Sequence, residues 1–206
     1  AIDELNQARE VFPKDAQLIA TLVDHYFKSN EQDKAVEMLE ELVLADPDNG
    51  RAHLALADVY LSKQEKEKAY EQLELAFHSS DIDLDTKMKI LIRVHESTYA
   101  IDPKISALAN QMPIEYPNES KAHSIQGDYY LRAEKDDLAL AAYKKALAID
   151  KSQFAIWNQV LIMEYQAKLY PDLYADGKEC ASLFPTNTTV VLLYGVAANQ
   201  LGKHQE

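Results

Sequence analysis

The sequence predicts an all-α protein built from repeated helical hairpins, and three observations lead to that prediction. Pro13, Pro47, Pro117 and Pro185 each end an apolar, helix-like run, at intervals of 34, 70 and 68 residues. These intervals are one or two copies of a 34-residue period, with two residues added in the middle one. Apolar residues recur at helical spacing within each period. Only five glycines occur in 206 residues, fewer than a turn-rich all-β fold needs.

A 34-residue frame that puts these prolines at place 32 describes residues 1–206 as a single array. Apolar side chains at places 4, 7, 8 and 11 form one helical stripe, and those at places 20, 24 and 27 form a second. Each unit is therefore expected to hold two antiparallel helices, and the two added residues are expected near Asp83–Asp85. The frame predicts about twelve helices, in a half repeat at 1–15, full repeats at 16–49, 50–83, 86–119, 120–153 and 154–187, and a half repeat at 188–206.

The units fit this frame unequally. Unit 120–153 fits best, with Gly127 at place 8 and Tyr143 at place 24, whereas unit 86–119 has Lys89 and Arg93 at places that usually pack. The pattern resembles the tetratricopeptide repeat from end to end. The resemblance implies a right-handed α-solenoid of stacked antiparallel helix pairs, the tetratricopeptide superhelix.

The two ends of the array stop in the middle of a repeat. The run Val190–Tyr194 is apolar, whereas the terminal repeat of a solenoid needs a polar outer face. We therefore expect a fragment of a longer array, or a chain that buries its ends in a copy of itself. Residues 80–91 are similar to a connector in bacterial tetratricopeptide proteins that are often exported to the envelope. A bacterial source is expected, and both the cytoplasm and the envelope remain open as locations.

Composition excludes several function classes. The chain has 21 basic and 34 acidic residues, a net charge of −13, which disfavours nucleic acid as a ligand. Residues 1–103 carry −11 of this charge and residues 104–206 carry −2. No apolar run approaches the roughly eighteen residues of a membrane span. Cys180 is the single cysteine, so neither an internal disulfide nor a multi-cysteine metal site is possible.

The sequence offers no pattern for catalysis, and we expect no catalytic, cofactor-binding or metal-binding residues. None of the six histidines pairs with another at i, i+4, so a helix-borne zinc site has no ligand set. Nucleophile-elbow, phosphate-loop and dinucleotide patterns are also missing. His53 and His123 share place 4 and are expected to replace a packed aromatic residue.

The resemblance to tetratricopeptide repeats implies a concave groove lined by places 2, 5, 9, 12 and 13 of each first helix. An array of stacked hairpins presents such an extended surface to a partner. The residues that we expect to contact a partner are Gln17, Asp24, Phe27, Lys28, Arg51, Asp58, Leu61, Lys121, Asp128, Arg132, Asn158 and Tyr165.

Three of these candidates are aspartates at place 9, namely Asp24, Asp58 and Asp128. Aspartates there would repel the C-terminal carboxylate that tetratricopeptide cochaperones bind, so that function is excluded. Two interpretations of the aspartates remain open. They accept lysine or arginine from an extended peptide, or they pair with neighbours such as Arg51, Lys121 or Arg132.

The sequence thus predicts a non-catalytic scaffold that binds a partner protein or extended peptide, with a basic partner as one candidate. One alternative is a docking or regulatory section of a larger protein whose catalytic domain lies outside the chain. A second alternative is a self-association module that forms a homo-oligomer through its uncapped terminal helices.

Overall fold

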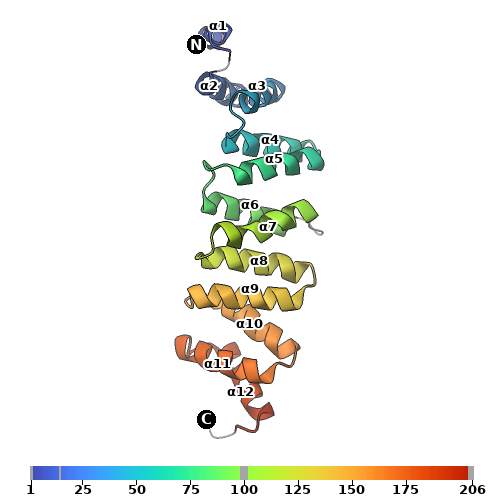
Figure 1. Ribbon diagram of the computed structural model, residues 1–206, viewed down its shortest axis with the longest axis vertical. Helices are drawn as coiled ribbons and strands as arrows, with labels where there is room; N and C mark the ends of the chain where they lie inside the picture. The colour runs from blue at the N-terminus through green and yellow to red at the C-terminus, as the bar shows by residue number, and fades with distance from the viewer. Residues whose placement is uncertain (1, 14, 98–101, 204–206) are drawn as a thin grey trace. The chain divides into compact units, whose positions relative to one another are not determined.

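The computed structural model describes residues 2–13, 15–97 and 102–203. Within these ranges every regular element is an α-helix, and there are twelve of them, so the predicted all-α solenoid class is confirmed (Figure 1). Parts of the predicted units at 1, 14, 98–101 and 204–206 lie outside the described residues. The helices are α1 (Ile2–Val11), α2 (Ala16–Lys28), α3 (Gln32–Ala45), α4 (Gly50–Ser62), α5 (Lys66–His78), α6 (Leu84–Ser97), α7 (Pro103–Glu115), α8 (Ser120–Arg132), α9 (Asp136–Ile149), α10 (Phe154–Gln166), α11 (Tyr170–Leu183) and α12 (Thr188–Gln200).

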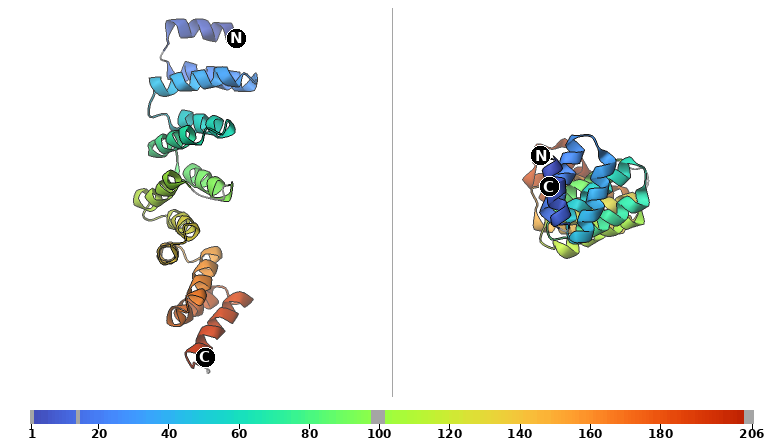
Figure 2. Two further views of the ribbon diagram at one scale, coloured as in Figure 1. Left: turned by 90° about the vertical axis from the view of Figure 1, so that its right-hand side faces the viewer. Right: turned by 90° about the horizontal axis from the view of Figure 1, so that it is seen from above.

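The chain forms two compact units, which are described separately. Unit 1 comprises Ala1–Ile90 and Asp102–Leu108, and its hairpins are α2 with α3 and α4 with α5 (Figure 2). Helix α3 also packs against α4, so the hairpins share one core. Ile19, Leu22 and Leu56 are almost completely buried in that core. The stripes of neighbouring helices therefore cover one another, as stacked repeats require.

Unit 2 comprises Leu91–Ile101 and Ala109–Glu206, and it holds the hairpin of α8 with α9 followed by α10, α11 and α12. Tyr143, Trp157 and Val160 lie in its core. Helix α11 packs more extensively on α12 than on α10. Gly177 permits this approach, because a Cβ atom there would lie 3.3 Å from the Cα of Tyr194 on α12.

The four hairpins whose turns are described reverse direction in the same way. The residue at place 15 adopts the left-handed conformation, and the next N–H donates to the carbonyl at place 11, as from Glu31 to Tyr26 at 2.9 Å. This is the Schellman pattern that ends a helix by satisfying its last carbonyls. The four left-handed residues are Asn30, Gln64, Glu134 and Lys168.

The predicted packing role of place 4 is confirmed in three repeats. The Nε2 atom of His53 lies 3.0 Å from the carbonyl oxygen of Pro47, and the Nε2 atom of His123 lies 2.8 Å from that of Pro117. The indole N–H of Trp157 donates to the carbonyl of Lys151 at 2.9 Å. Each side chain therefore ties its first helix to place 32 of the preceding repeat, which a histidine does as well as a tryptophan.

The connector between α5 and α6 is fixed to the start of α4. One carboxylate oxygen of Asp81 accepts the backbone N–H of Gly50 at 3.0 Å and the hydroxyl of Ser79 at 2.5 Å. A Cβ atom at position 50 would lie 2.4 Å from that oxygen, so the contact requires glycine.

Helix α6 differs from its expected register. Lys89 and Arg93 are exposed, whereas Lys87, Leu91 and Val94 are buried. Those buried positions match places 4, 8 and 11 of a repeat that begins at residue 84, directly after the repeat at 50–83. On the second helix, Ile105, Ala109 and Met112 keep the expected places and are buried. The burial pattern therefore puts the two added residues between α6 and α7 rather than near Asp83–Asp85.

Helix α12 begins at the expected residue but buries a different set of places from the one predicted. Val190, Leu193 and Ala197 are buried, whereas Val191, expected at place 4, is 52% exposed. Leu192 is 65% exposed. The face of α12 that packs is therefore the one next to α10 and α11, and an apolar face stays open.

Candidate functional site

The candidate residues of unit 1 lie on the outward face of its first helices, α2 and α4. Asp24 and Phe27 are three residues apart on α2, so they are neighbours on one face of the helix. Asp58 and Leu61 repeat this arrangement on α4. We call the following set the first-helix face of unit 1, and all of its members are exposed except the half-buried Leu61: Gln17, Asp24, Phe27, Lys28, Arg51, Asp58 and Leu61.

The candidate residues of unit 2 lie on α8 and α10. Lys121 and Tyr165 are exposed, whereas Asp128, Arg132 and Asn158 are half-buried. We call these five residues the first-helix face of unit 2. It differs from the face of unit 1 because packing within the unit already uses part of it.

Asp128 is held by its own repeat. The hydroxyl of Tyr143 on α9 donates to the Asp128 carboxylate at 2.7 Å. Burial raises the pKa of Asp128, and the hydrogen bond from Tyr143 opposes that shift. The sequence left two partners open for this aspartate, a bound peptide or a neighbouring arginine or lysine. Its partner in the structure is instead the tyrosine at place 24.

Arg132 is engaged in a similar way. Its guanidinium donates to the backbone carbonyl of His95, at the end of α6 within unit 2. The half-buried side chain therefore stabilises packing between helices. Of the unit 2 candidates, Lys121 and Tyr165 are the exposed ones.

The next question is whether the described residues could bind a metal ion or supply a reactive group. In the described ranges, no group of three or more histidine, cysteine, aspartate or glutamate side chains is arranged to hold a metal ion. Cys180 is fully buried, and burial raises the pKa of its thiol to about 11, which keeps it protonated. Across the helices that the structure describes, none is both long and apolar enough to cross a membrane.

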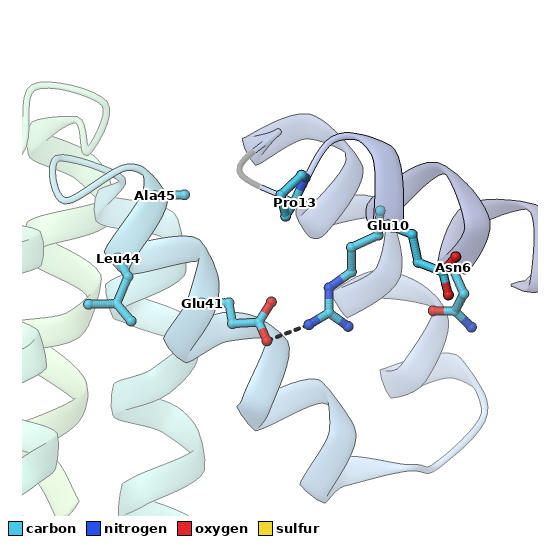
Figure 3. Close-up of a pocket in the computed structure, with 7 residues that line it drawn as sticks. Asn6, Glu10, Pro13, Glu41, Leu44 and Ala45 are labelled. Carbon is cyan, nitrogen blue, oxygen red and sulfur yellow. Dashed lines mark hydrogen bonds and ion pairs between the residues drawn. The ribbon is translucent and has the colours of Figure 1, made fainter.

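A pocket of about 660 Å³ lies outside the predicted groove, between α1 and α3 (Figure 3). Arg9 of α1 forms an ion pair with Glu41 of α3 across this pocket. Leu44 lines its α3 side and is 81% exposed. The sequence did not predict this surface. Leu44 stands at place 29, outside the apolar stripes, and the frame assigns no role to that place.

A buried ionic cluster in unit 2 was also missed. Glu164 stands at place 11 of α10 and is completely buried. The ammonium of Lys144 on α9 lies 2.6 Å from its carboxyl group and 3.0 Å from that of Asp176 on α11. Burial and a hydrogen bond with Asp176 raise the pKa of Glu164 to about 8, although Lys144 opposes the shift. A glutamate at a packing place was the sequence signal for this cluster.

Comparison with known proteins identifies the repeat. A family model described as tetratricopeptide repeat matches residues 1–49 and 33–79. The sequence has no match among curated proteins. The family match identifies tetratricopeptide repeats in residues 1–79, and the later helices form hairpins of the same architecture.

Three solved structures illustrate the likeness. PilF of Pseudomonas aeruginosa is 19% identical with a TM-score of 0.50, and the match covers 97% of this chain and 87% of PilF. MamA AMB-1 is 16% identical with a TM-score of 0.56, covering 78% of this chain and 86% of MamA. MamA from Desulfovibrio magneticus RS-1 is 11% identical with a TM-score of 0.52, covering 84% and 97%. At these identities the likeness concerns the fold alone.

Proposed function

We propose that this chain is a non-catalytic scaffold in which the first-helix face of each unit binds an extended segment of a partner protein. The observation that carries the proposal is the residue type at place 12. Phe27 and Tyr165 occupy this place in units 1 and 2 and are 38% and 45% exposed. Leu61 and Leu131 occupy it in two other repeats and are half-buried.

Packing within the repeats leaves the side chains of Phe27 and Tyr165 exposed. The buried stripe of each first helix uses places 4, 7, 8 and 11, and place 12 lies beside it toward solvent. Complete burial of a large apolar side chain stabilises a folded protein or complex by about 1.5–3 kcal/mol, and a partly exposed side chain contributes less. A bound segment would cover these side chains and gain the remaining part of that free energy. Aromatic side chains commonly contribute most of the binding energy at protein interfaces.

Capture of a partner from a lysate of the source organism tests this function. The full chain serves as bait, beside the double variant Phe27→Ser with Tyr165→Ser. The matched control is Leu44→Ser with Leu138→Ser, which removes two exposed apolar side chains from the second helices α3 and α9. Far-ultraviolet circular dichroism verifies that all baits keep their helical content.

We expect the control to retain the partner and the place-12 variant to lose at least nine-tenths of it. Equal retention by both double variants would contradict the proposal. Selective loss with the control, Leu44→Ser with Leu138→Ser, would contradict it as well, because it would assign binding to the second helices instead.

Self-association is a second candidate, and the open apolar face of α12 favours it. Val191 and Leu192 are exposed side by side there. Light scattering coupled to size exclusion distinguishes this candidate from the first. A dimer that becomes monomeric in Val191→Ser with Leu192→Ser supports self-association, whereas a wild-type monomer at about 50 μM excludes it.

A further inference from the structure

Helices α10 and α12 of unit 2 present an uncharged surface in an acidic chain. Each helix has 13 residues, and the one acidic or basic residue among them is Glu164, which is completely buried. In contrast, the first helices α2, α4 and α8 expose charged side chains such as Asp24, Arg51 and Lys121. The chain as a whole is 27% charged, so the lack of exposed charge is a particular property of α10 and α12.

The two helices carry the same kinds of side chain at matching places. On each helix, places 5, 12 and 13 hold one large aromatic or aliphatic side chain and two amide side chains, and residues seven or eight apart lie on one side of a helix. We call these six residues the neutral face of unit 2: Asn158, Tyr165, Gln166, Leu192, Asn199 and Gln200. Helices α10 and α12 contact each other, so the two rows are neighbours.

The neutral face lies on the side of both helices that the second helices leave open. The ring of Tyr194 on α12 lies 5.1 Å from that of Tyr174 on α11, and the carboxyl group of Glu164 on α10 faces α9. Two residues along an α-helix correspond to a rotation of about 200°. Leu192 and Gln166 are each two residues from these contacts, so they lie on the opposite side of their helices.

The face combines exposed apolar surface with unused hydrogen-bonding groups. Tyr165 is 45% exposed and Leu192 is 65% exposed. Gln166, Asn199 and Gln200 are also exposed, and Asn158 is half-buried. Within the described residues, no hydrogen bond engages any of the four amide groups. Apolar patches of this kind on a protein surface mark interaction sites.

The amide groups indicate which conformation of ligand fits. A side-chain amide both donates and accepts hydrogen bonds. An extended segment leaves its backbone N–H and C=O groups unpaired, whereas a helix pairs most of its own. Four amides beside two apolar side chains therefore match an extended backbone with apolar side chains. A charged side chain of the ligand would lose hydration here without meeting an opposite charge.

We propose that the neutral face of unit 2 binds an uncharged, apolar segment in an extended conformation. Its amides form hydrogen bonds with the ligand backbone, and Tyr165 and Leu192 pack against the ligand side chains. This inference rests on the scaffold function proposed above and specifies the ligand of unit 2.

Fluorescence anisotropy with designed peptides tests the inference on the full chain. The probe is a fluorescein-labelled peptide of Leu-Ser-Val-Thr repeated twice, with an amidated C-terminus. Two comparison peptides with the same label replace each leucine and valine by lysine or by glutamate. A third keeps the probe sequence but carries N-methyl groups on alternate backbone nitrogens, which removes hydrogen-bond donors.

The protein variants remove amide groups in matched pairs. Gln166→Ala with Gln200→Ala removes two amides of the neutral face. The control is Gln7→Ala with Gln32→Ala, which removes two exposed glutamines on α1 and α3. Both pairs are alike in residue type and exposure, and circular dichroism verifies that both variants keep their helical content.

We expect the uncharged peptide to bind at least tenfold more tightly than each comparison peptide. The lysine peptide is the most demanding comparison, because the net charge of −13 attracts it. The Gln166→Ala with Gln200→Ala variant should weaken binding of the uncharged peptide about fivefold or more, and the control less than twofold. Equal weakening by both variants would overturn the inference, as would a comparison peptide that binds as tightly as the probe.

The two proposals fail separately. If a lysate partner is lost from Phe27→Ser with Tyr165→Ser while Gln166→Ala with Gln200→Ala binds the peptide like the wild type, the scaffold function stands and the ligand assignment falls. If the place-12 variant retains the partner, the scaffold function falls, whereas the peptide result concerns the chemistry of the neutral face by itself.

Discussion

Glycine at place 8 of a first helix has opposite consequences in two helices of unit 2. A Cβ atom at Gly127 would lie 2.6 Å from the ring of Tyr143, whose hydroxyl is bound to Asp128 and cannot simply move away. At Gly195 on α12, nothing lies within 4 Å of a Cβ atom. One glycine is a packing requirement, and the other only costs helix stability.

We therefore predict that Gly127→Ala destabilises the protein by about 1–3 kcal/mol because the ring must shift. Gly195→Ala is expected to stabilise it by about 0.5–1 kcal/mol, since alanine replaces glycine inside a helix without a clash. Urea unfolding followed by circular dichroism measures both values. A stabilised Gly127→Ala variant would show that the Tyr143 contact is not tight.

Individual residues also mark where sequence reasoning stopped. The repeat frame placed Asp128 and Tyr143 at places 9 and 24, but the frame gives spacing along each helix and not which side chains meet between helices. The aspartate was therefore assigned to the groove, although it pairs inside the repeat. In contrast, the exposure of Asp24 and Phe27 followed directly from their places on the helix.

At the scale of elements, the hairpin turns have a common cost. Gln64, Glu134 and Lys168 adopt positive φ angles of 62°, 56° and 57° without being glycine. An L-residue in this conformation costs roughly 1–2 kcal/mol, which glycine avoids at some cost in unfolded-state entropy. Asn30 tolerates the same conformation better than these three residues.

Lys168→Gly is accordingly expected to stabilise the protein by about 0.5–1 kcal/mol. The control is Lys145→Gly, which changes an exposed lysine inside α9 and should destabilise by about 1 kcal/mol. Thermal unfolding of both variants provides the comparison. A lower melting temperature for Lys168→Gly would indicate that the lysine side chain contributes more than its backbone costs.

The apolar stripes predicted the helix pairing correctly in four repeats. In the fifth repeat, the register predicted for α6 was wrong. Its buried face includes Lys87, and a lysine carries no apolar signal, so the pattern was assigned to a later register. The amine of Lys87 lies 6.0 Å from the ring centre of Phe77, which explains how the fold accommodates it. A helix register predicted from apolar side chains alone is therefore wrong where a long polar side chain is buried.

The ionic cluster between α9, α10 and α11 makes stability depend on pH. The pKa of Glu164 is about 8 in the folded chain, compared with an ordinary value of 4.5. The folded state therefore holds a proton that the unfolded state releases, and stability from this group falls as pH rises from about 4.5 to about 8.

Glu164→Gln keeps the shape of the side chain and removes that titration. We expect the variant to gain stability relative to the wild type between pH 5 and pH 8, on the order of 2–4 kcal/mol. The control is Glu179→Gln, whose partner Lys151 is exposed, and its effect should stay below about 1 kcal/mol at every pH. A constant difference between Glu164→Gln and the wild type across this range would argue against a protonated Glu164.

At the scale of the whole molecule, stability should be distributed locally, because each repeat packs only on its neighbours. Leu56 on α4 and Leu161 on α10 are each 1% exposed, in unit 1 and unit 2 respectively. Truncating a buried leucine to alanine costs about 2–5 kcal/mol. That loss should therefore fall mainly on the helices around the substituted residue.

Hydrogen exchange measured by mass spectrometry tests this distribution. We expect Leu56→Ala to accelerate exchange in α2–α5 while α10–α12 keep wild-type rates, and Leu161→Ala to do the reverse. The pair is matched in residue type and burial, so a difference in location must come from the packing around each residue. Equal acceleration throughout both units by either variant would contradict local stability and would instead indicate one cooperative folding unit.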